Sequence, residues 1–402
     1  MGSYGAALSE HPLATQAVGE MVGQLLESVG PAPDLAVLFV TGPHTGALED
    51  IARAVRQLLN PRVLVGATAV SVLGGSREVE DAPGMSLWAA RFDVDLEPVR
   101  LEAFRSPDEE ILVAGGGVLG RNEGTLLLLA DPFSFPADEV LAHLSEAAPG
   151  VQIIGGFASA ARQPGGNVLV LDDERFRDGA VGVWLPPSVA VSPVVSQGCR
   201  PIGQALTVTK AERNVLYELA GQPALDRLMD QIEELDAQEK SLAQQGLHVG
   251  IVIDEHQLDF DRGDFLVRGV LGADRAAGAV AISEHVEVGT TVQFQVRDAG
   301  TAAEDLVSLM EQHSAPAALV FTCNGRGSRL FGTPDHDASV VSESLRATAV
   351  GGMFCAGEFG PVGGTNFVHQ FTASVAMFDA SRRTVDPADR AEAAGETTPP
   401  VE

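Results

Sequence analysis

VGGMFCAGEFG, residues 350–360, closes the last of three strand–helix–strand patterns in this sequence. Its earlier counterparts are RVLVGATAVS, which begins at Arg62, and VQIIGGFASA, which begins at Val151. Each is an apolar run that ends on glycine or other small residues, which is typical of a buried strand that reaches a loop. The recurrence predicts that one structural unit is used three times.

The strand that opens each unit and the helix that follows it are also recognisable. DLAVLFVTG, GTLLLLADPFSF and AALVFTCNGRG, which begin at Asp34, Gly124 and Ala317, are apolar runs bounded by turn residues. Helical spacing follows in TGALEDIARAVRQLLN, PADEVLAHLSEAAPG and SVVSESLRATA. A further alternating strand comes after each unit, in GMSLWAARFDV, GAVGVWLPP and VHQFTASVAMFD. We therefore expect an α/β fold in which two related subdomains of layered, mixed or antiparallel β-sheets carry helices on the outside, and not a simple Rossmann fold.

The middle of the chain has a different pattern. ERNVLYELAGQPALDRLMDQIEELDAQEKSLAQQG, residues 212–246, predicts two helices with a break at Pro223, because proline is tolerated at a helix start. Four strands, LHVGIVIDE, DFLVRGVLGAD, GAVAISEHV and TTVQFQVRD, and the helix TAAEDLVSLMEQHS should follow. We expect a partly helical N-terminal segment, two subdomains and a disordered acidic tail, at residues 1–33, 34–219, 220–381 and 382–402.

The formal net charge of −29 is the strongest global signal. Such a field repels phosphate backbones, and the sequence has no run rich in lysine and arginine, so we expect no nucleic-acid partner. Apolar runs such as TLLLLADPF are too short to span a bilayer, so we expect no membrane association. Cys199, Cys323 and Cys355 lie far apart, and the N-terminal residues lack the pattern of a secretion signal. These features favour free thiols and a cytoplasmic location.

Histidines and clustered acids give no metal signature. His336 lies between Asp335 and Asp337 and is expected in a solvated turn, because adjacent residues rarely chelate one ion together. The acids of EVED, residues 78–81, are expected in a solvated turn as well. AGGGVLGR, residues 114–121, and IIGGFASA both lack a complete nucleotide-binding fingerprint. We expect no metal and no cofactor.

FTCNGRG, residues 321–327, is the first candidate for a binding loop. It follows a buried strand, and ligands in sheet proteins gather beyond the carboxyl ends of strands. Asn324 offers a donor and an acceptor, and Arg326 offers a fork suited to a carboxylate. The alternative is that Arg326 pairs with a surface acid. For Cys323 the sequence favours a small residue that lines a pocket over a nucleophile, since no histidine stands at an identifiable pairing position.

VSQGCRPIG, residues 195–203, has the same order of strand, glycine, thiol and arginine. Arg200 could direct its guanidinium into a cleft, or form a salt bridge between the halves. In IIGGFASA, Gly155 and Gly156 are expected to permit close backbone approach, with Phe157 and Ser159 facing a cavity.

Taken in order, five stretches resemble the FIST domain proteins, which pair a FIST N-terminal with a FIST C-terminal subdomain. They are IIGGFASA, VSQGCRPIGQALTVTKAERNVLYELAGQPALDRL, DFLVRGVLGADRAAGAVAIS, FTCNGRG and GEFGPVGGTNFVHQFT. The resemblance covers roughly Asp34 to Asp379. It implies a bacterial-type intracellular sensory module for small ligands, with amino acids or related metabolites as candidates. Its subdomains would correspond to residues 34–219 and 220–381.

We therefore expect recognition of a small metabolite, with Arg326 or Arg200 on its carboxylate and Glu358 on an ammonium group. A signalling protein partner and a homodimer are further expectations. Two alternatives stay open: a thiol-dependent hydrolase or transferase that uses Cys323 or Cys355, and an acidic scaffold that binds a protein. The residues expected to contact the ligand are Gly156, Phe157, Ser159, Gly198, Arg200, Cys323, Asn324, Arg326, Gly357 and Glu358.

Overall fold

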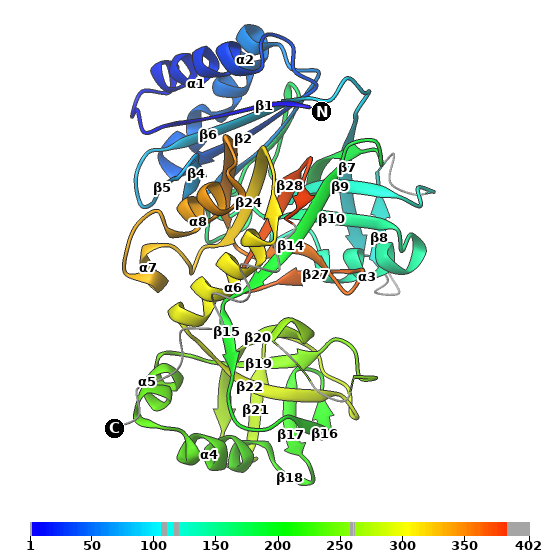
Figure 1. The fold of residues 1–402 in the computed structure, drawn as a ribbon. Coiled ribbons are helices and arrows are strands. Elements are labelled where there is room, and N and C mark those ends of the chain that lie inside the picture. Colours follow the sequence, from blue (N-terminus) through cyan, green and yellow to red (C-terminus); the bar gives the residue numbers. More distant parts are fainter. Residues whose placement is uncertain (1, 106–110, 116–119, 258–259, 261, 384–402) are drawn as a thin grey trace, which may run out of the picture.

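The computed structural model describes residues 2–105, 111–115, 120–257, 260 and 262–383, and these form two bodies, one above the other in Figure 1. The small lower body lies within residues 199–297. The larger upper body combines residues 2–198 with residues 298–383. The chain therefore crosses between the bodies twice, and the small body is an insertion in the large one.

The elements of the large body fall into three successive units. The first contains β1 (Ser3–Ser9), α1 (Ala14–Ser28), β2 (Leu35–Thr41), η1 (Gly42–Ala47), α2 (Leu48–Leu59), β3 (Val63–Ala69), β4 (Val72–Gly74), β5 (Arg77–Val79) and β6 (Met85–Arg91). The second contains β7 (Glu97–Arg105), β8 (Ile111–Ala114), β9 (Gly124–Ala130), α3 (Ala137–Ala147), β10 (Val151–Phe157), β11 (Leu169–Leu171), β12 (Glu174–Phe176) and β13 (Ala180–Leu185). The third contains β14 (Val191–Gln197), α6 (Ala299–Glu311), β23 (His313–Ser314), β24 (Ala317–Cys323), α7 (Ser328–Phe331), α8 (His336–Leu345), β25 (Ala349–Cys355), β26 (Glu358–Val362), β27 (Thr365–His369), β28 (Thr372–Phe378) and β29 (Ser381–Arg382).

All three units have the same strand pairing. In each unit, two strands that pair in parallel are separated in the sequence by a helix. These pairs are β2–β3, β9–β10 and β24–β25. A later strand, β6, β13 or β28, pairs antiparallel with the first of the two. The strand that opens the unit, β1, β7 or β14, pairs with that later strand. The repetition predicted from the sequence is confirmed, as is the class of layered, mixed α/β sheets.

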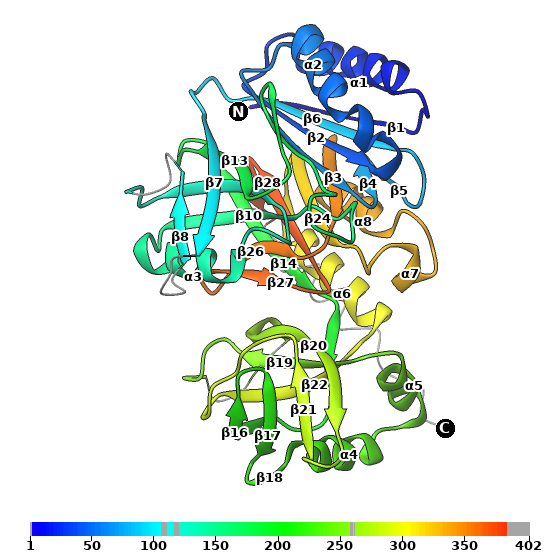
Figure 2. The ribbon, with the colours of Figure 1, turned by 180° about the vertical axis from the view of Figure 1, so that it is seen from behind.

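Each unit contributes its hairpin to the sheet of another unit. The hairpin β4–β5 of the first unit pairs with β25 of the third, and β11–β12 of the second pairs with β3 of the first. The hairpin β26–β27 of the third unit pairs with β10 of the second, which completes the cycle. Each of the three main sheets of the large body is therefore built from two units, and the orange and red C-terminal strands run through the middle of the body (Figure 2).

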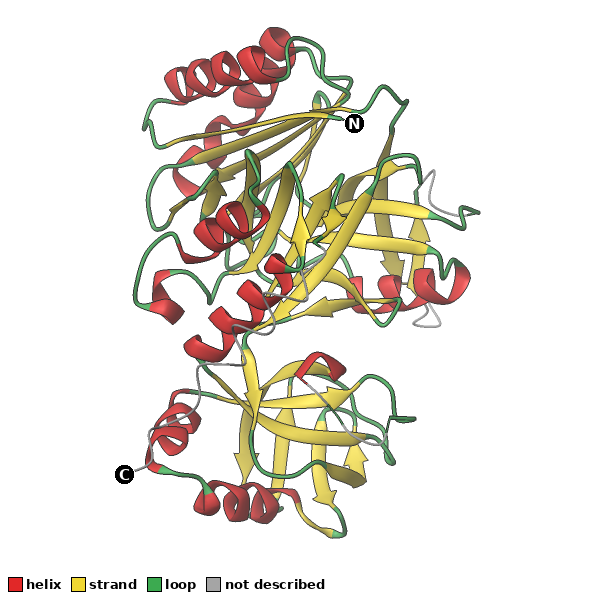
Figure 3. Cartoon of the chain, in the orientation of Figure 1, coloured by secondary structure: helices red, strands yellow, loops and turns green. Residues whose placement is uncertain are grey.

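Helices cover the outer faces of these sheets, and strands fill the inside (Figure 3). The largest cluster of buried apolar side chains takes residues from all three units and lies between the sheets. Three outer clusters fill the spaces under α1 and α2, under α3, and under α6 and α8. Strands β2, β3, β24 and β25 are buried at every position because both faces of their sheets are covered.

The small body has its own apolar core and its own sheet. Because β19 pairs with β20 and also with β22, the strand pairing closes on itself as a barrel. Its elements are β15 (Cys199–Pro201), β16 (Leu206–Glu212), β17 (Val215–Leu219), β18 (Gln222–Pro223), α4 (Ala224–Glu234), α5 (Ala237–Gln245), β19 (Leu247–Val252), η2 (Arg262–Asp264), β20 (Phe265–Asp274), β21 (Ala279–Ile282) and β22 (Thr291–Arg297).

The four predicted strands after residue 246 and the predicted helix after residue 300 are confirmed as β19 to β22 and α6. The prediction of a helix at the start of residues 212–246 is wrong. Residues 206–219 form the hairpin β16–β17, in which Arg213 takes a left-handed backbone with φ 55°. Leu216 and Leu219 enter the barrel core, so the apolar spacing belongs to a strand and a turn, and helix begins only after Pro223.

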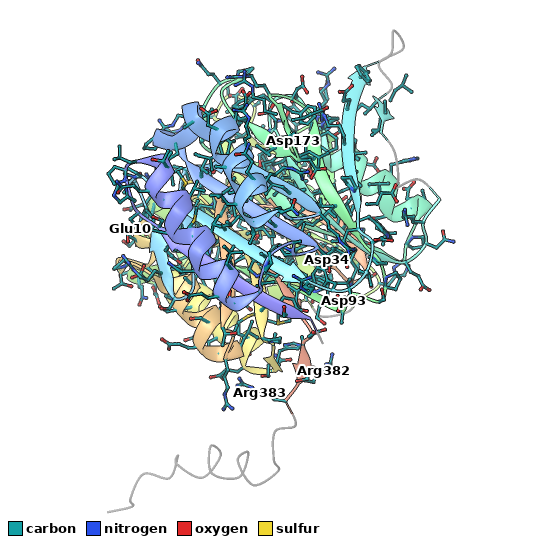
Figure 4. All side chains as sticks on the ribbon, turned by 90° about the horizontal axis from the view of Figure 1, so that it is seen from above. Glu10, Asp34, Asp93, Asp173, Arg382 and Arg383 are labelled. Atoms are coloured by element: carbon teal, nitrogen blue, oxygen red, sulfur yellow. The ribbon has the colours of Figure 1, made fainter. Side chains whose placement is uncertain are left out.

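Residues 1–33 hold the expected helix, α1, and also β1, a strand at the edge of its sheet that the sequence pattern did not predict. Residues 384–402, most of the expected tail, lie outside the described residues. Of the helices that are described, none has the length and apolar character needed to cross a membrane. Exposed acids such as Glu10, Asp93 and Asp173 lie on the face that carries α1 and α2 (Figure 4).

Candidate functional site

The carboxyl ends of β3, β10 and β25 meet inside the large body and hydrogen-bond to one another. The Ser159 amide donates to the Thr68 carbonyl, and the Ser159 hydroxyl donates to the Phe354 carbonyl. The Phe157 amide donates to the Gly357 carbonyl at 2.9 Å. These bonds satisfy backbone groups that would otherwise be left unpaired where three strands end. The small residues that close each sequence unit therefore hold the three units together.

Close backbone approach explains the glycines of β10. A Cβ atom at Gly155 would lie 1.9 Å from the Leu128 carbonyl oxygen, and one at Gly156 would lie 2.6 Å from the Cys355 sulfur. Gly156 pairs directly with Glu358 in the exchanged hairpin. The prediction that these glycines permit close packing agrees with the geometry, and the packing places Glu358 deep inside the body.

Glu358 is fully buried. Its Oε2 atom accepts hydrogen bonds from the hydroxyl (2.8 Å) and the amide (3.2 Å) of Thr372, while Oε1 has no partner in the protein. Burial raises the pKa of Glu358 to about 8, although the bonds from Thr372 oppose that rise. At neutral pH this side chain is therefore mostly a neutral acid.

Arg326 is fully buried and pairs with Asp337, which is also fully buried. Its Nε and Nη2 atoms donate to the two carboxylate oxygens at 2.7 and 2.9 Å, so the guanidinium fork faces an internal acid. Burial alone would raise the pKa of Asp337, but the Arg326 charge and the surrounding hydrogen bonds hold it well below its usual range. Only Nη1 of Arg326 has no partner, and it lies beside Gly198, where a Cβ atom would be 3.3 Å away.

The prediction of a solvated turn for the EVED acids is wrong for Glu78 and Glu80, while Asp81 is exposed in a bend. Glu78 is buried in β5, and its Oε1 accepts from the Ala338 amide at the start of α8. Burial and the nearby Asp337 raise the pKa of Glu78 to about 8. Glu80 accepts from the amide and the hydroxyl of Ser328. The hairpin exchange carries these acids from the first unit onto the third.

All three cysteines are buried and close to one another. Cys323 and Cys355 are register partners on β24 and β25, and Cys199 lies near enough to Cys323 for the two to affect each other's charge. Burial raises the pKa of the Cys199 and Cys323 thiols to about 12, and that of Cys355 well above its ordinary value. Such thiols are poor nucleophiles at neutral pH, which weighs against a thiol-dependent enzyme.

Phe371 connects this region to the small body. It lies in the turn between β27 and β28 with φ 64°, a left-handed conformation that is an outlier for a bulky side chain. Its ring meets the His248 ring edge-on at 4.2 Å between centroids, and the Arg297 guanidinium lies 5.2 Å from its centroid. Its backbone amide faces the Cys323 thiol. The strained turn therefore touches β19 and β22 of the small body and the strand end of the large body.

Unpartnered polar atoms concentrate at this junction. Among the described residues, fourteen buried side-chain nitrogen and oxygen atoms have no hydrogen-bond partner in the protein, and seven of these fourteen belong to the junction. Buried polar groups are normally paired, so each exception calls for a partner from outside the chain. We call these residues the junction cluster: Gln197, His248, Gln295, Arg297, Arg326 and Glu358.

The junction cluster combines donors and acceptors from both bodies. His248 and Gln295 are register partners on β19 and β22, and Gln197 precedes Gly198 at the crossing point. The pKa of His248 is lowered to about 4 by burial and by the neighbouring Arg297, so its ring is neutral. Arg297 donates to the Gly325 carbonyl and leaves Nε free. The arrangement suits a small polar molecule held between the bodies.

The structure brings together most of the residues expected at the site. Gly156, Gly198, Cys323, Arg326, Gly357 and Glu358 lie around the strand end beside the junction. Asn324 is exposed at the rim next to Cys323. Two residues that were expected to face a cavity pack in the core instead. Phe157 packs edge-on against Phe359, and Ser159 forms hydrogen bonds with the backbone.

Arg200 lies away from the junction cluster. Because side chains alternate along β15, Arg200 points to the face opposite its neighbour Cys199. It forms ion pairs with Glu239 of α5 at 2.9 Å and with Asp298 at the start of α6 at 3.3 Å. The alternative of a salt bridge that joins the two bodies is the one that the geometry supports.

Sequence reasoning missed His248, Gln295, Arg297, Gln197 and Phe371. A signal for three of them was present, since His248, Gln295 and Arg297 are polar residues within otherwise apolar strand patterns. The position of Phe371 has no such signal. Its role depends on a turn conformation and on contacts with residues more than seventy positions away in the chain.

Comparisons with known proteins identify the family of the chain. The FIST N domain matches residues 34–222, and the FIST C domain matches residues 224–361. The chain belongs to the FIST family. FIST domains are generally associated with signal transduction and small-ligand sensing. The boundary between the two FIST domains falls at Pro223, the last residue of β18, inside the small body.

Relatives in mycobacteria match the FIST chain along most of its length. The uncharacterized protein Mb0898c of Mycobacterium bovis is 42% identical over 382 residues, which cover 93% of this chain and 98% of the relative. The uncharacterized protein MT0897 of Mycobacterium tuberculosis gives the same values. The uncharacterized protein Rv0628c of Mycobacterium tuberculosis is 41% identical, with 93% and 99% covered.

Proposed function

We propose that this FIST protein is a sensor that binds a small carboxylate metabolite, an amino acid or a related acid, at the junction between its two bodies. The observation that carries the proposal is the junction cluster, in which half of the unpartnered buried polar atoms of the described residues face one region. A ligand that completes these hydrogen bonds gains affinity without first breaking bonds inside the protein.

Local charge favours an anion in spite of the acidic surface. The charge of Arg326 is matched by Asp337, and Glu358 and His248 are neutral near pH 7. The guanidinium of Arg297 bonds to a backbone carbonyl, so its charge is the one left to attract a carboxylate. This corrects the expected division of roles, in which the fork of Arg326 would bind the ligand. Arg326 offers only Nη1.

A ligand between the bodies would also link binding to a signal. Both crossings of the chain lie beside the junction cluster, and the Asp298 amide donates to the Gly198 carbonyl at 3.4 Å where they meet. A molecule that bonds to both bodies favours one relative orientation of the two. A protein partner that reads this orientation, a homodimer and a cytoplasmic location are parts of the same proposal.

Native mass spectrometry of the purified protein, followed by calorimetry with a panel of small carboxylates, tests this proposal. Arg297→Gln should weaken binding by at least about tenfold, because it removes a charge-assisted hydrogen bond. Arg200→Gln is the matched control, since Arg200 is another half-buried arginine near the crossing but points away from the cluster. Equal affinity of the two variants, or no bound small molecule and no binding from the panel, would contradict the proposal.

A further inference from the structure

Glu358 has no cationic partner. Its hydrogen bonds come from the hydroxyl and the amide of Thr372. The nearest guanidinium, that of Arg326, has already given its Nε and Nη2 donors to Asp337. An ionised carboxylate that is buried in this way pays a large desolvation cost, so the group keeps its proton.

The other groups around Glu358 do not supply a compensating charge. His369, its register partner on β27, is buried and donates to the Gly360 carbonyl through Nε2. Burial lowers its pKa to about 4, so it is neutral. Cys323 on β24 and Cys355 on β25 are neutral thiols. Arg326 and Asp337 form an ion pair whose charges cancel. The surroundings of the carboxyl are therefore close to neutral as a whole.

A neutral carboxyl group has one oxygen that accepts and one hydroxyl that donates. Oε2 takes the accepting role, because it receives the two hydrogen bonds from Thr372. Oε1 is then the hydroxyl, and its proton has no acceptor in the protein. A ligand that bonds to this hydroxyl must therefore supply a hydrogen-bond acceptor.

Two more donors without partners belong to the junction cluster, Nη1 of Arg326 and Nε of Arg297. The Cys323 thiol links them to Glu358, since Glu358, Arg326 and Arg297 are all close enough to interact with its charge. Three donors on side chains around one thiol fit a carboxylate. An ammonium group in this place would be repelled by the two guanidinium groups. It would have an anionic partner only if Glu358 lost its proton.

We propose that Glu358 meets the ligand as a neutral acid that donates a hydrogen bond, so the ligand is an organic acid with a carboxylate and no ammonium group. This inference rests on the proposed function and narrows it: an amino acid is replaced by a 2-hydroxy or 2-oxo acid. Glu358 is then a group that selects the ligand class, in a role opposite to the expected one of holding an ammonium group.

Calorimetry with pairs of probes that differ only at the α-carbon tests the inference. Suitable pairs are L-lactate with L-alanine and 2-hydroxyglutarate with L-glutamate, each measured at pH 7 in two buffers with different enthalpies of ionisation. The hydroxy acid of a pair should bind at least about tenfold more tightly, and no proton should be released, because Glu358 is already neutral. Tighter binding of the amino acid with release of about one proton would overturn the inference and leave the proposed function standing.

Two variants of the same size make the test specific for the hydroxyl. Glu358→Gln keeps a donor at this position and should keep the affinity for the hydroxy acid within about threefold. Glu358→Met keeps the volume, removes the donor, and should lose at least about tenfold. Equal loss in both variants would overturn the donor role. If no acid of either kind binds to the wild-type protein, the proposed function fails, and the inference fails with it.

Infrared spectroscopy of the ligand-free protein provides a second, independent readout. A protonated buried carboxyl has a carbonyl stretch separate from that of a carboxylate, so part of this band at pH 7 should be lost in Glu358→Gln, while the contribution of Glu78, whose pKa is also raised to about 8, remains. An unchanged spectrum would mean that Glu358 is ionised, which overturns the inference even if a hydroxy acid binds.

Discussion

Asp131 and Glu358 are two buried carboxyl groups at strand ends of the same sheet, and their surroundings differ. Asp131 follows β9, and its two oxygens accept hydrogen bonds from Asn167, Ser134 and the Phe133 amide. Glu358 begins β26, is equally buried, and has one oxygen without a partner. Burial alone therefore does not separate a structural acid from the one that we propose faces a ligand. The separation comes from whether the protein completes the hydrogen bonds.

Asp337, like Asp131, is a structural acid. Of the substitutions considered, Asp337→Asn should reduce the free energy of unfolding most. The variant leaves the Arg326 charge buried without a counter-charge, and the free energy of unfolding should fall by about 3–5 kcal/mol. Urea unfolding followed by circular dichroism measures the loss. Asp50→Asn, at an exposed position on α2, is the control and should change little. A loss for Asp337→Asn as small as that of the control would mean that the buried pair is not structural.

Asp131→Asn and Glu358→Gln compare the two acids directly. Asp131→Asn places an amide among donors that need an acceptor, and should lower the free energy of unfolding by about 2–3 kcal/mol. Glu358→Gln replaces a neutral acid with a neutral amide and should change it by less than about 1 kcal/mol. Urea midpoints at pH 7 give both values. Equal losses of unfolding free energy in the two variants would mean that Asp131 and Glu358 do not differ in structural role.

The pH dependence of stability sharpens the comparison further. The pKa of Glu358 and that of Glu78 are raised from 4.5 to about 8 in the folded state. These two groups give the folded chain extra protons up to about pH 8. His248 and His369, whose pKa values are lowered to about 4, have the opposite effect below about pH 6.5, so stability should fall mainly as pH rises from about 6.5 to 8. Glu358→Gln should reduce that fall by about 1–2 kcal/mol, since burial shifts of this kind are only partly expressed.

Unfolding measured at pH 6.5 and at pH 8 in both proteins checks this expectation. The residual pH dependence of Glu358→Gln should belong mainly to Glu78. A wild-type protein that gains stability across this range would contradict the assignment of a neutral Glu358.

Arg200→Gln should have the smallest effect. Its two ion pairs are partly exposed, so the free energy of unfolding should change by less than about 1 kcal/mol. Ligand affinity should stay within about threefold, because the side chain points away from the junction cluster. Thermal unfolding and calorimetry measure the two quantities. A tenfold loss of affinity would place Arg200 in the site and restore the original expectation.

The sequence pattern could predict the three units because each is local. An apolar run, a helical spacing and a second run that ends on small residues lie within about forty residues of one another in each unit. The exchange of hairpins could not be predicted, because β4 and β25 are related only by contact across the chain. Glu78 was misplaced for this reason, since its acidic neighbours indicate a turn and only the third unit buries it.

The candidate site was predicted in part. Cys323, Arg326 and Glu358 stand at ends of sequence patterns, where loops carry function, and the structure brings them together. Their roles could not be predicted, because the sequence does not reveal that Asp337 occupies the fork of Arg326. The contribution of the small body was missed, since His248 and Arg297 reach the site only through the insertion of one body in the other.

The cyclic exchange of hairpins also has a consequence for how the chain is made. On the ribosome, β4 and β5 emerge long before Gly351, Gly352 and Met353, the residues with which β4 pairs. At about 5–20 residues per second, this delay is on the order of tens of seconds. During that time the first unit has an unpaired sheet edge, and apolar residues that are buried in the folded chain are exposed there. Chaperones bind exposed apolar edges of this kind. The large body can therefore close only when the last unit has left the exit tunnel.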